Sequence, residues 1–267
     1  LVHSAEPVEL TDEQMDNLVL RAYPYVAMFN VNNKFALDAA NPLTTGGYNR
    51  VYSNTTLADH TLKAIARPNN DTLYTVAMVD VSEVPVVMEM PAFDSTYASL
   101  MVTAYDHYVN IPMSIAQGDF GKPANILFYS ERTPGYDGAP VEGIDRTFEV
   151  TGDFVSALLR VMPHAAEPER LEANRAAMAS VNLVTLPEFL GRQSADTELL
   201  PWDSPNGISK NLSLKEDLAR FPEFGSDFEI FEDRFVEVMQ FVVNHTTFDA
   251  NDPADQALLK ALAPLGI

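Results

Sequence analysis

Residues 67–81 read Arg67-Pro68-Asn69-Asn70-Asp71-Thr72-Leu73-Tyr74-Thr75-Val76-Ala77-Met78-Val79-Asp80-Val81, a polar turn that runs directly into an apolar stretch. From Thr72 to Val81 apolar residues occupy both alternating positions, which is typical of a strand buried on both faces. Pro68 restricts the residue before it to extended backbone, and the two asparagines that follow favour a turn. The stretch therefore predicts a buried strand with a polar turn at its start.

Four further stretches extend the predicted sheet. Val84–Met90 and Tyr97–Tyr105 read as strands joined to the first by short turns. If these three strands pair in chain order, they form a simple antiparallel meander. Two more strands are predicted at Asn125–Ser130 and Arg146–Val150, whereas residues 38–58 read as a loop rich in Asn, Ser, Thr and Gly.

A helix is predicted before the sheet. Thr11-Asp12-Glu13-Gln14 is a capping-box pattern, in which the first and last side chains satisfy each other's backbone N–H groups. Apolar residues then recur at helical spacing, which predicts a helix from Asp12 to Phe29 with a kink near Pro24.

Helical patterns also follow the sheet. From Asp153 onward the pattern reads as helix, with one apolar stripe made of Phe154, Leu158, Leu159 and Met162. Further helices are predicted over Pro168–Val181 and over residues 228–245, while residues 185–211 read as irregular. A last helix is predicted after Asp252, which would cap it, with Pro253 at its first position.

Together these patterns predict an α+β fold. An antiparallel sheet in the first half, sheet-rich over residues 60–150, packs with a helical second half over residues 151–267. At 267 residues the chain is long enough to bury a sizeable core as a single domain. Its content of 46% hydrophobic and 21% charged residues is typical of a folded globular protein.

The charge excludes two classes of partner. With 38 acidic against 17 basic residues the net charge is −21, and there is no basic cluster to meet a phosphate backbone or an anionic membrane surface. No apolar run approaches the roughly 20 residues that span a bilayer. We therefore expect no nucleic-acid partner and no membrane insertion. The chain has 0 cysteines, which excludes disulfides and thiolate chemistry.

Arg67 is the most informative charged residue. No other Lys or Arg occurs from Pro68 to Gly121, although seven acidic residues do. Arg67 could brace a neighbouring carboxylate, that of Asp71 or Asp94, in a purely structural turn. Alternatively, it lines a pocket with Asn70, Asp71 and Tyr74 and holds an anionic group of a ligand. In an enzyme, Asp71 would then act as acid or base.

Asp106-His107-Tyr108 is a second candidate for chemistry. A carboxylate beside an imidazole could tune a general base or supply two metal ligands, which makes His107 the second acid–base candidate and Asp106 a ligand-binding one. Adjacent residues of an extended chain point to opposite sides, however. In a simple meander the pair would also lie at the opposite end of the sheet from Arg67.

Metal and cofactor motifs are not found. The remaining histidines match no zinc-ligand spacing, and Gly46-Gly47 lacks the spacing and the Lys of a phosphate loop. The acidic residues between Asp249 and Asp255 lack the glycine and the terminal Glu of a calcium loop, so helix capping explains them better. We therefore expect no metal site and no cofactor.

Two parts of the chain resemble the DUF1254 family of bacterial proteins. One is the Arg67–Tyr74 block together with the strand after proline, Glu83-Val84-Pro85-Val86-Val87; the other is the closing segment Leu258–Ile267. The resemblance covers nearly the whole chain. Many members carry a second domain, DUF1214, after this part. The family often has a histidine four residues after the asparagine matching Asn49, a ligand-binding candidate, but here that position is Ser53.

The resemblance implies a mixed α and β domain, frequent homo-oligomers and export, hence a periplasmic or secreted location, but no reaction. The chain begins with Leu1 rather than Met, which signal-peptide cleavage or a trimmed start would explain. We expect an exported protein with a pocket for an anionic or polar organic molecule and, if it is an enzyme, cofactor-free hydrolysis or isomerisation. The alternative is a non-catalytic structural or oligomer-assembly module.

Overall fold

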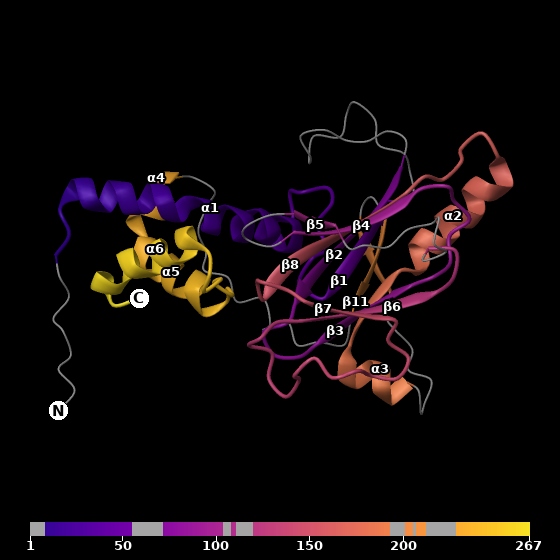
Figure 1. The fold of residues 1–267 in the computed structure, drawn as a ribbon. Helices are drawn as coiled ribbons and strands as arrows, with labels where there is room; N and C mark the ends of the chain where they lie inside the picture. Colours follow the sequence, from indigo (N-terminus) through magenta and orange to yellow (C-terminus); the bar gives the residue numbers. More distant parts are fainter. Residues whose placement is uncertain are drawn as a thin grey trace.

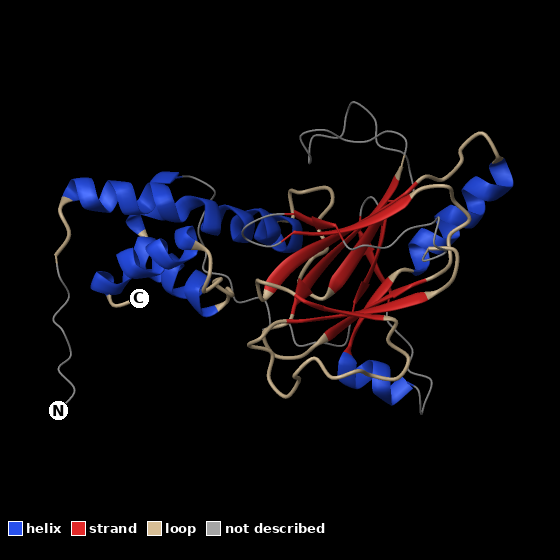
Figure 2. Cartoon of the chain, viewed as in Figure 1, coloured by secondary structure: helices blue, strands red, loops and turns tan. Residues whose placement is uncertain are grey.

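The computed structural model describes residues 9–54, 72–103, 108–110, 120–192, 201–204, 207–211 and 228–267, and the statements below concern these residues. Two β-sheets pack face to face, and a lobe of helices lies at one end of them (Figures 1 and 2). The α+β class predicted from the sequence is confirmed.

The larger sheet has seven strands in the order β10-β11-β1-β2-β8-β4-β5, and every neighbouring pair is antiparallel. Its strands are β1 (Arg50–Asn54), β2 (Leu73–Asp80), β4 (Ala98–Thr103), β5 (Tyr108–Asn110), β8 (Phe154–Val161), β10 (Pro201–Ser204) and β11 (Gly207–Asn211). The two longest, β2 and β8, lie side by side near its middle.

The smaller sheet has four strands in the order β7-β6-β3-β9. They are β3 (Val86–Met90), β6 (Ala124–Tyr129), β7 (Arg146–Glu149) and β9 (Asn182–Thr185). β6 and β7 run parallel, while the other pairs are antiparallel. Helix α3 (Leu186–Arg192) follows β9 directly and packs on this sheet (Figure 1).

Side chains of β2 alternate between two cores, because successive residues of a strand point to opposite faces. Leu73, Ala77 and Val79 point between the sheets, where a large apolar core forms. Val76 and Met78 point away from the smaller sheet, into a second core shared with the helical lobe. All five side chains are buried, so β2 is apolar on both faces for the reason predicted.

The helical lobe consists of α1 (Asp12–Leu37), α4 (Phe228–Asp233), α5 (Phe235–Asn244) and α6 (Pro253–Leu262), followed by the short 3-10 helix η2 (Ala263–Leu265). α1 packs on α5 and α6 and also reaches β2 and β8 (Figure 1). Helix α2 (Pro168–Ser180) lies at the opposite end of the sandwich, with Met178 buried in the inter-sheet core. None of the helices in the described ranges is long and apolar enough to cross a membrane.

Two helix starts are confirmed in atomic detail. The Thr11 hydroxyl accepts a hydrogen bond from the Gln14 N–H at 3.2 Å, and the Gln14 side chain accepts one from the Thr11 N–H at 2.9 Å. Asp252 accepts from the Ala254 N–H at 2.9 Å, with Pro253 at the first position of α6. Both depend on contacts within one turn, which is why sequence suffices to predict them.

Three predictions of local structure are wrong. The helix predicted from Asp153 is strand β8, because Phe154–Val161 is buried on both faces and its apolar residues fit either period. The meander is also wrong, since β8 lies between β2 and β4, and β3 belongs to the other sheet. Residues 50–54, predicted as loop, form β1, whose polar Ser53 and Asn54 are buried.

Two helix limits also differ from prediction. α1 continues past Phe29 to Leu37, since Asn30 and Asn32 are buried within it and the Asn32 amide donates to the Phe154 carbonyl at 3.3 Å. The predicted helix over residues 228–245 is two helices, separated at Arg234. Residues 185–211, predicted as irregular, contain α3, β10 and β11.

Candidate functional site

One row of side chains crosses four strands of the larger sheet, on the face turned away from the smaller sheet. Asn54 of β1 lies opposite Tyr74 of β2, Tyr74 opposite Arg160 of β8, and Arg160 opposite Ser99 of β4. Directly opposite residues in an antiparallel pair project to the same face, so these four side chains are neighbours. We call these four residues the Arg160 row.

Arg160 is the only charged member of the row. Its guanidinium carbon lies 5.6 Å from the centre of the Tyr74 ring, a cation–π contact that orients the guanidinium. Its Nε is buried, and among the described residues it has no hydrogen-bond partner and no ion pair. A partly buried arginine without a carboxylate is unexpected in a chain with 38 acidic residues. Buried donors are normally satisfied, so this guanidinium can take up an external acceptor.

Other polar groups surround the row. The Tyr97 hydroxyl donates to the Ser99 hydroxyl oxygen at 3.3 Å, and Tyr97 is 43% exposed. Two residues before Tyr74, the Thr72 hydroxyl is buried with no hydrogen-bond partner in the part of the chain that the structure describes. Burial raises the pKa of the nearby Tyr52 to about 12, so its phenol stays neutral. Among the described residues named here, Arg160 is therefore the only charged group and the others are polar and neutral.

Of the predicted site residues, Tyr74 lies in this row and is 4% exposed. Arg67, Asn70, Asp71, Asp106 and His107 lie outside the described residues, and their roles stay predictions. Asp94, a predicted partner of Arg67, accepts a hydrogen bond from the Arg170 Nε at 3.0 Å. Its carboxylate is thus already engaged by a different arginine.

Asn49, the remaining candidate, lies at the other end of β2. Its amide oxygen accepts from the Asp80 N–H at 2.9 Å, and its amide nitrogen donates to the Asp80 carbonyl at 3.1 Å. With a φ of 57° it occupies the left-handed region, which asparagine tolerates better than most residues. These bonds hold the start of β1 against the end of β2, and the predicted ligand-binding role of Asn49 stays a prediction.

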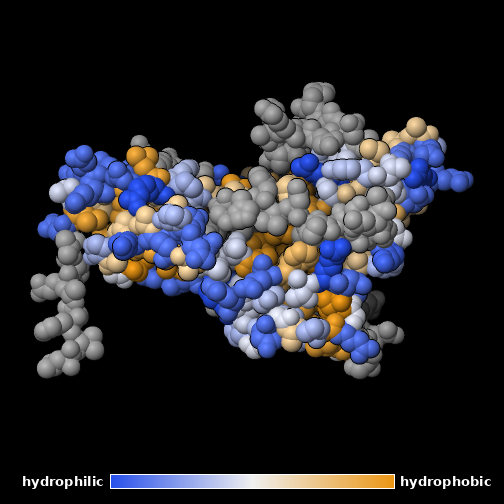
Figure 3. Space-filling view, viewed as in Figure 1, coloured by the Kyte–Doolittle hydropathy of each residue, from blue (hydrophilic) through white to orange (hydrophobic). Residues whose placement is uncertain are grey.

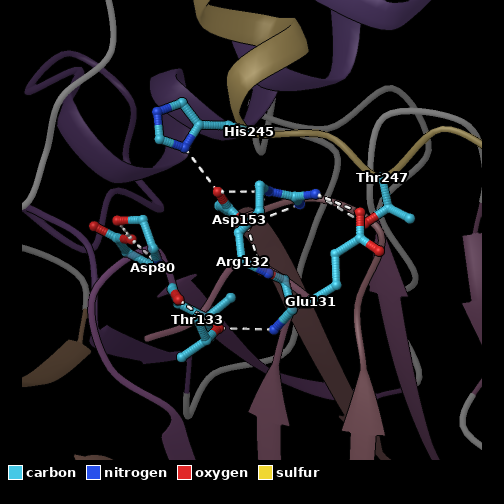
Figure 4. A network of polar contacts seen from close by, with 10 residues as sticks. Asp80, Glu131, Arg132, Thr133, Asp153, His245 and Thr247 are labelled. Carbon is cyan, nitrogen blue, oxygen red and sulfur yellow. Dashed lines mark hydrogen bonds and ion pairs between the residues drawn. The ribbon is translucent and has the colours of Figure 1, made fainter. Parts of the chain in front are cut away.

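A second cluster, the Asp153 network, joins the helical lobe to the sandwich (Figure 4). Asp153 lies just before β8, and its side chain is 2% exposed. Its carboxylate accepts hydrogen bonds from the Ser130 hydroxyl at 2.5 Å, Arg132 Nη2 at 2.9 Å and His245 Nδ1 at 2.7 Å. Arg132 Nη1 also donates to the Thr247 hydroxyl at 3.0 Å. One buried carboxylate thus ties the loop after β6 to the end of α5.

Asp80 lies beside this network and has a different electrostatic environment. One carboxylate oxygen accepts from the Ser82 N–H at 2.9 Å and from its hydroxyl at 2.6 Å, whereas the other is buried without a partner in the described chain. Burial is the main cause that raises the pKa of Asp80 to about 6; Asp153 adds to the rise, while the Ser82 bonds and His245 oppose it. The two neighbouring buried carboxylates thus differ in hydrogen bonding, since Asp80 has one oxygen without a partner in the described chain and Asp153 has none.

The pKa of Asp153 shifts the other way. Burial alone would raise this pKa, but the hydrogen bonds from His245, Arg132 and Ser130 outweigh burial and lower it. Asp153 is therefore ionised near neutral pH, so the His245 Nδ1 facing it carries the hydrogen. A histidine oriented by a buried carboxylate has acid–base capacity at its other ring nitrogen, while the Asp153 oxygens accept hydrogen bonds from Ser130, Arg132 and His245.

The two clusters are too far apart to act on one small ligand. Asp153 precedes β8, and Arg160 lies seven residues later near its other end. At ~3.3 Å per residue of strand, the two are roughly 23 Å apart. The Asp153 network therefore braces the lobe, while the Arg160 row is the candidate binding site. Within the described ranges, no group of three or more metal-ligating side chains occurs.

The sequence carried one signal for the Arg160 row that was missed. Arg160 is the only charged residue in the apolar run Phe154–Val161, which is unusual for a buried strand. The partners in the Asp153 network had no such signal, because Asp153 and His245 are 92 residues apart. Only the fold brings them together.

Comparisons with known proteins identify the family but supply no reaction. The profile of a family described as protein of unknown function, DUF1254, matches residues 48–185, just over half of the chain. No curated protein matches the sequence.

Two solved structures are similar. The VPA0106 protein from Vibrio parahaemolyticus is 17% identical, with a TM-score of 0.47, over 93% of this chain and 56% of that one. An uncharacterised protein from Burkholderia cenocepacia is 12% identical, with a TM-score of 0.29, over 73% of this chain and 62% of that one. This chain thus spans less than two thirds of either structure.

Proposed function

Because this chain belongs to the DUF1254 family, whose description records no activity, we propose a function from the site itself: the protein binds a small organic anion at the Arg160 row. The guanidinium of Arg160 contacts a carboxylate of the ligand. Tyr74 holds the guanidinium in place from one side, and Ser99 offers a hydroxyl on the other.

The observation that carries this proposal is the buried Nε of Arg160, which has no hydrogen-bond partner among the described residues. In a chain of net charge −21, an arginine normally finds a carboxylate of its own. Arg132, Arg170, Arg175 and Arg234 all do so. Arg160 is held instead against an aromatic ring, among neutral groups, with its Nε buried. A planar guanidinium in such surroundings is suited to a carboxylate, which it can bind through two parallel hydrogen bonds.

The ligand-binding roles predicted for Arg67, Asn70 and Asp71, which precede the strand of Tyr74 in sequence, stay predictions because these residues lie outside the described part of the chain. Cofactor-free hydrolysis or isomerisation, with Asp71 or His107 as acid or base, stays a prediction. Export to the periplasm and assembly into homo-oligomers also stay predictions. Light scattering would test the assembly by measuring the molar mass in solution.

Binding of sodium acetate and sodium phosphate at constant ionic strength, measured by thermal shift and calorimetry, tests the proposal. We expect acetate to stabilise the wild-type protein and Arg160→Gln to weaken its binding at least tenfold while remaining folded. Arg175→Gln is the matched control, because it removes the same charge from a surface pair with Glu172 on α2. Equal binding by the wild type and Arg160→Gln, or no anion binding by the wild type, would overturn the proposal.

A further inference from the structure

The row of side chains next to the Arg160 row is apolar on the same face of the sheet. Two residues before Arg160, Leu158 lies opposite Val76 of β2 and Met101 of β4. Leu158 and Met101 are only partly buried, although neighbouring positions that point between the sheets are fully buried. A partly exposed apolar surface therefore begins directly beside the unsatisfied guanidinium.

This apolar surface has a limited extent. Beyond Leu158 it passes into the core of the helical lobe, where Val76 and Leu158 pack with residues of α1 and α5. Figure 3 shows hydrophobic residues in the middle of the molecule, whereas much of the outer surface of the lobe is hydrophilic. Two positions along a strand span ~6.6 Å, which is the distance between the backbone positions of Arg160 and Leu158.

We propose that the ligand is a monocarboxylate with an apolar chain or ring, whose carboxylate binds Arg160 and whose apolar part lies over Leu158 and Met101. This inference rests on the proposed function and narrows its substrate class. The carboxylate satisfies the guanidinium, and the apolar part removes the exposed surface of two side chains from water.

Charge complementarity favours a single carboxylate over a multiply charged anion. The row holds one cation, and its other members, Asn54, Tyr74 and Ser99, are neutral. A phosphate dianion would bring a second negative charge to a chain of net charge −21, whereas Arg160 is the one cation among the described residues of the row. A dicarboxylate would have to place its second carboxylate over Leu158 and Met101, where no cation lies among the described residues of the two rows.

A series of straight-chain carboxylates from acetate to octanoate, titrated by calorimetry at one pH and ionic strength, tests the inference. We expect the dissociation constant to fall by about fourfold for each added methylene that is buried, until the chain exceeds the apolar surface. Inorganic phosphate should bind more weakly than hexanoate.

Two variants test which side chains cause the gain in affinity with chain length. Met101→Gln and Leu158→Ser should each reduce the advantage of hexanoate over acetate several-fold, because hexanoate affinity falls more than acetate affinity. Met101→Gln is the milder change, since Leu158 also packs against the lobe. Leu190→Ser on α3 is the matched control, because this leucine is 46% exposed. It should change the affinity for neither acetate nor hexanoate.

The outcomes separate this inference from the proposed function. Equal affinities for acetate and hexanoate, or a chain-length gain that persists in both variants, overturn the apolar-ligand inference. If Arg160→Gln still abolishes acetate binding in that case, the proposed anion site stands. If no carboxylate binds through Arg160, both fail.

Discussion

Replacing Asp80 by Asn should change how the stability of this protein depends on pH. Asp80 is 1% exposed, and one of its carboxylate oxygens is buried without a hydrogen-bond partner among the described residues. Its ionised form is therefore poorly solvated, and burial raises its pKa from 3.8 to about 6. The folded protein thus binds this proton more tightly than the unfolded chain does.

The direction of the effect follows from that difference. Between pH 3.8 and about 6 the folded state holds more protons at Asp80, so the free energy of unfolding falls as pH rises through this window. At about 1.4 kcal/mol for each pH unit, the full cost of the ionised carboxylate above the window is about 3 kcal/mol. The asparagine of the Asp80→Asn variant cannot ionise, so the variant avoids this cost. Its amide N–H₂ would lack an acceptor, which costs about 1 kcal/mol at every pH.

Urea denaturation followed by circular dichroism at pH 4, 6 and 8, at constant ionic strength, measures the effect. The variant-minus-wild-type difference in unfolding free energy should grow by about 2.4 kcal/mol from pH 4 to pH 8, since part of the full effect is already present at pH 4. Titrating groups that do not interact with Asp80 contribute equally to both proteins and cancel in this difference. Asp16→Asn, at an exposed position of α1, makes the same charge change and should show no such growth.

A difference that stays constant with pH would refute this reasoning. It would mean that the buried oxygen of Asp80 is solvated or paired in solution, and that its proton affinity is ordinary. A pH-dependent difference shared by Asp16→Asn would mean that general charge repulsion, and not burial, is the cause.

Further predictions concern stability. Asp153→Asn should lower the unfolding free energy at pH 7 by about 3 kcal/mol in urea denaturation, because it leaves Arg132 without its buried partner. Since the pKa of Asp153 is lowered in the folded protein, this loss of stability should shrink as the pH falls below 3.8. Thr11→Ala should cost about 1 kcal/mol and speed amide hydrogen exchange at Gln14, whose N–H it leaves unpaired, with Asp12→Asn as a neighbouring control. Phe154→Ala should cost about 3–5 kcal/mol on thermal or urea unfolding, because the ring packs with Tyr48, Phe241 and His245, whereas Val236→Ala at a half-exposed site should cost little.

The elements predicted correctly depend on contacts within a few residues. The Thr11 capping box and the Asp252 cap each close within one helical turn. The strand Leu73–Asp80 was predictable because a sandwich core on one face and a helical lobe on the other bury every position. A continuous apolar run of this length is typical of a strand covered on both faces.

The errors occur where local patterns allow two structures. Phe154–Val161 is buried on both faces, and its apolar residues fit a helical period as well as a strand, so periodicity alone could not decide. β1 was missed because its polar Ser53 and Asn54 read as loop, yet Ser53 is buried and bonded to Thr75 and to the Met178 carbonyl. Those partners lie 22 and 125 residues away.

By itself, the sequence determined the family, the α+β class, the helix caps and the buried strand that carries Tyr74. Only the tertiary structure decided what lies beside Tyr74. Strand β8 pairs with β2 and places Arg160 against the Tyr74 ring, and the same pairing puts Leu158 beside Val76. Which strands become neighbours depends on side chains distant in the chain that pack into shared cores, so no local pattern identifies β8 as the neighbour of β2.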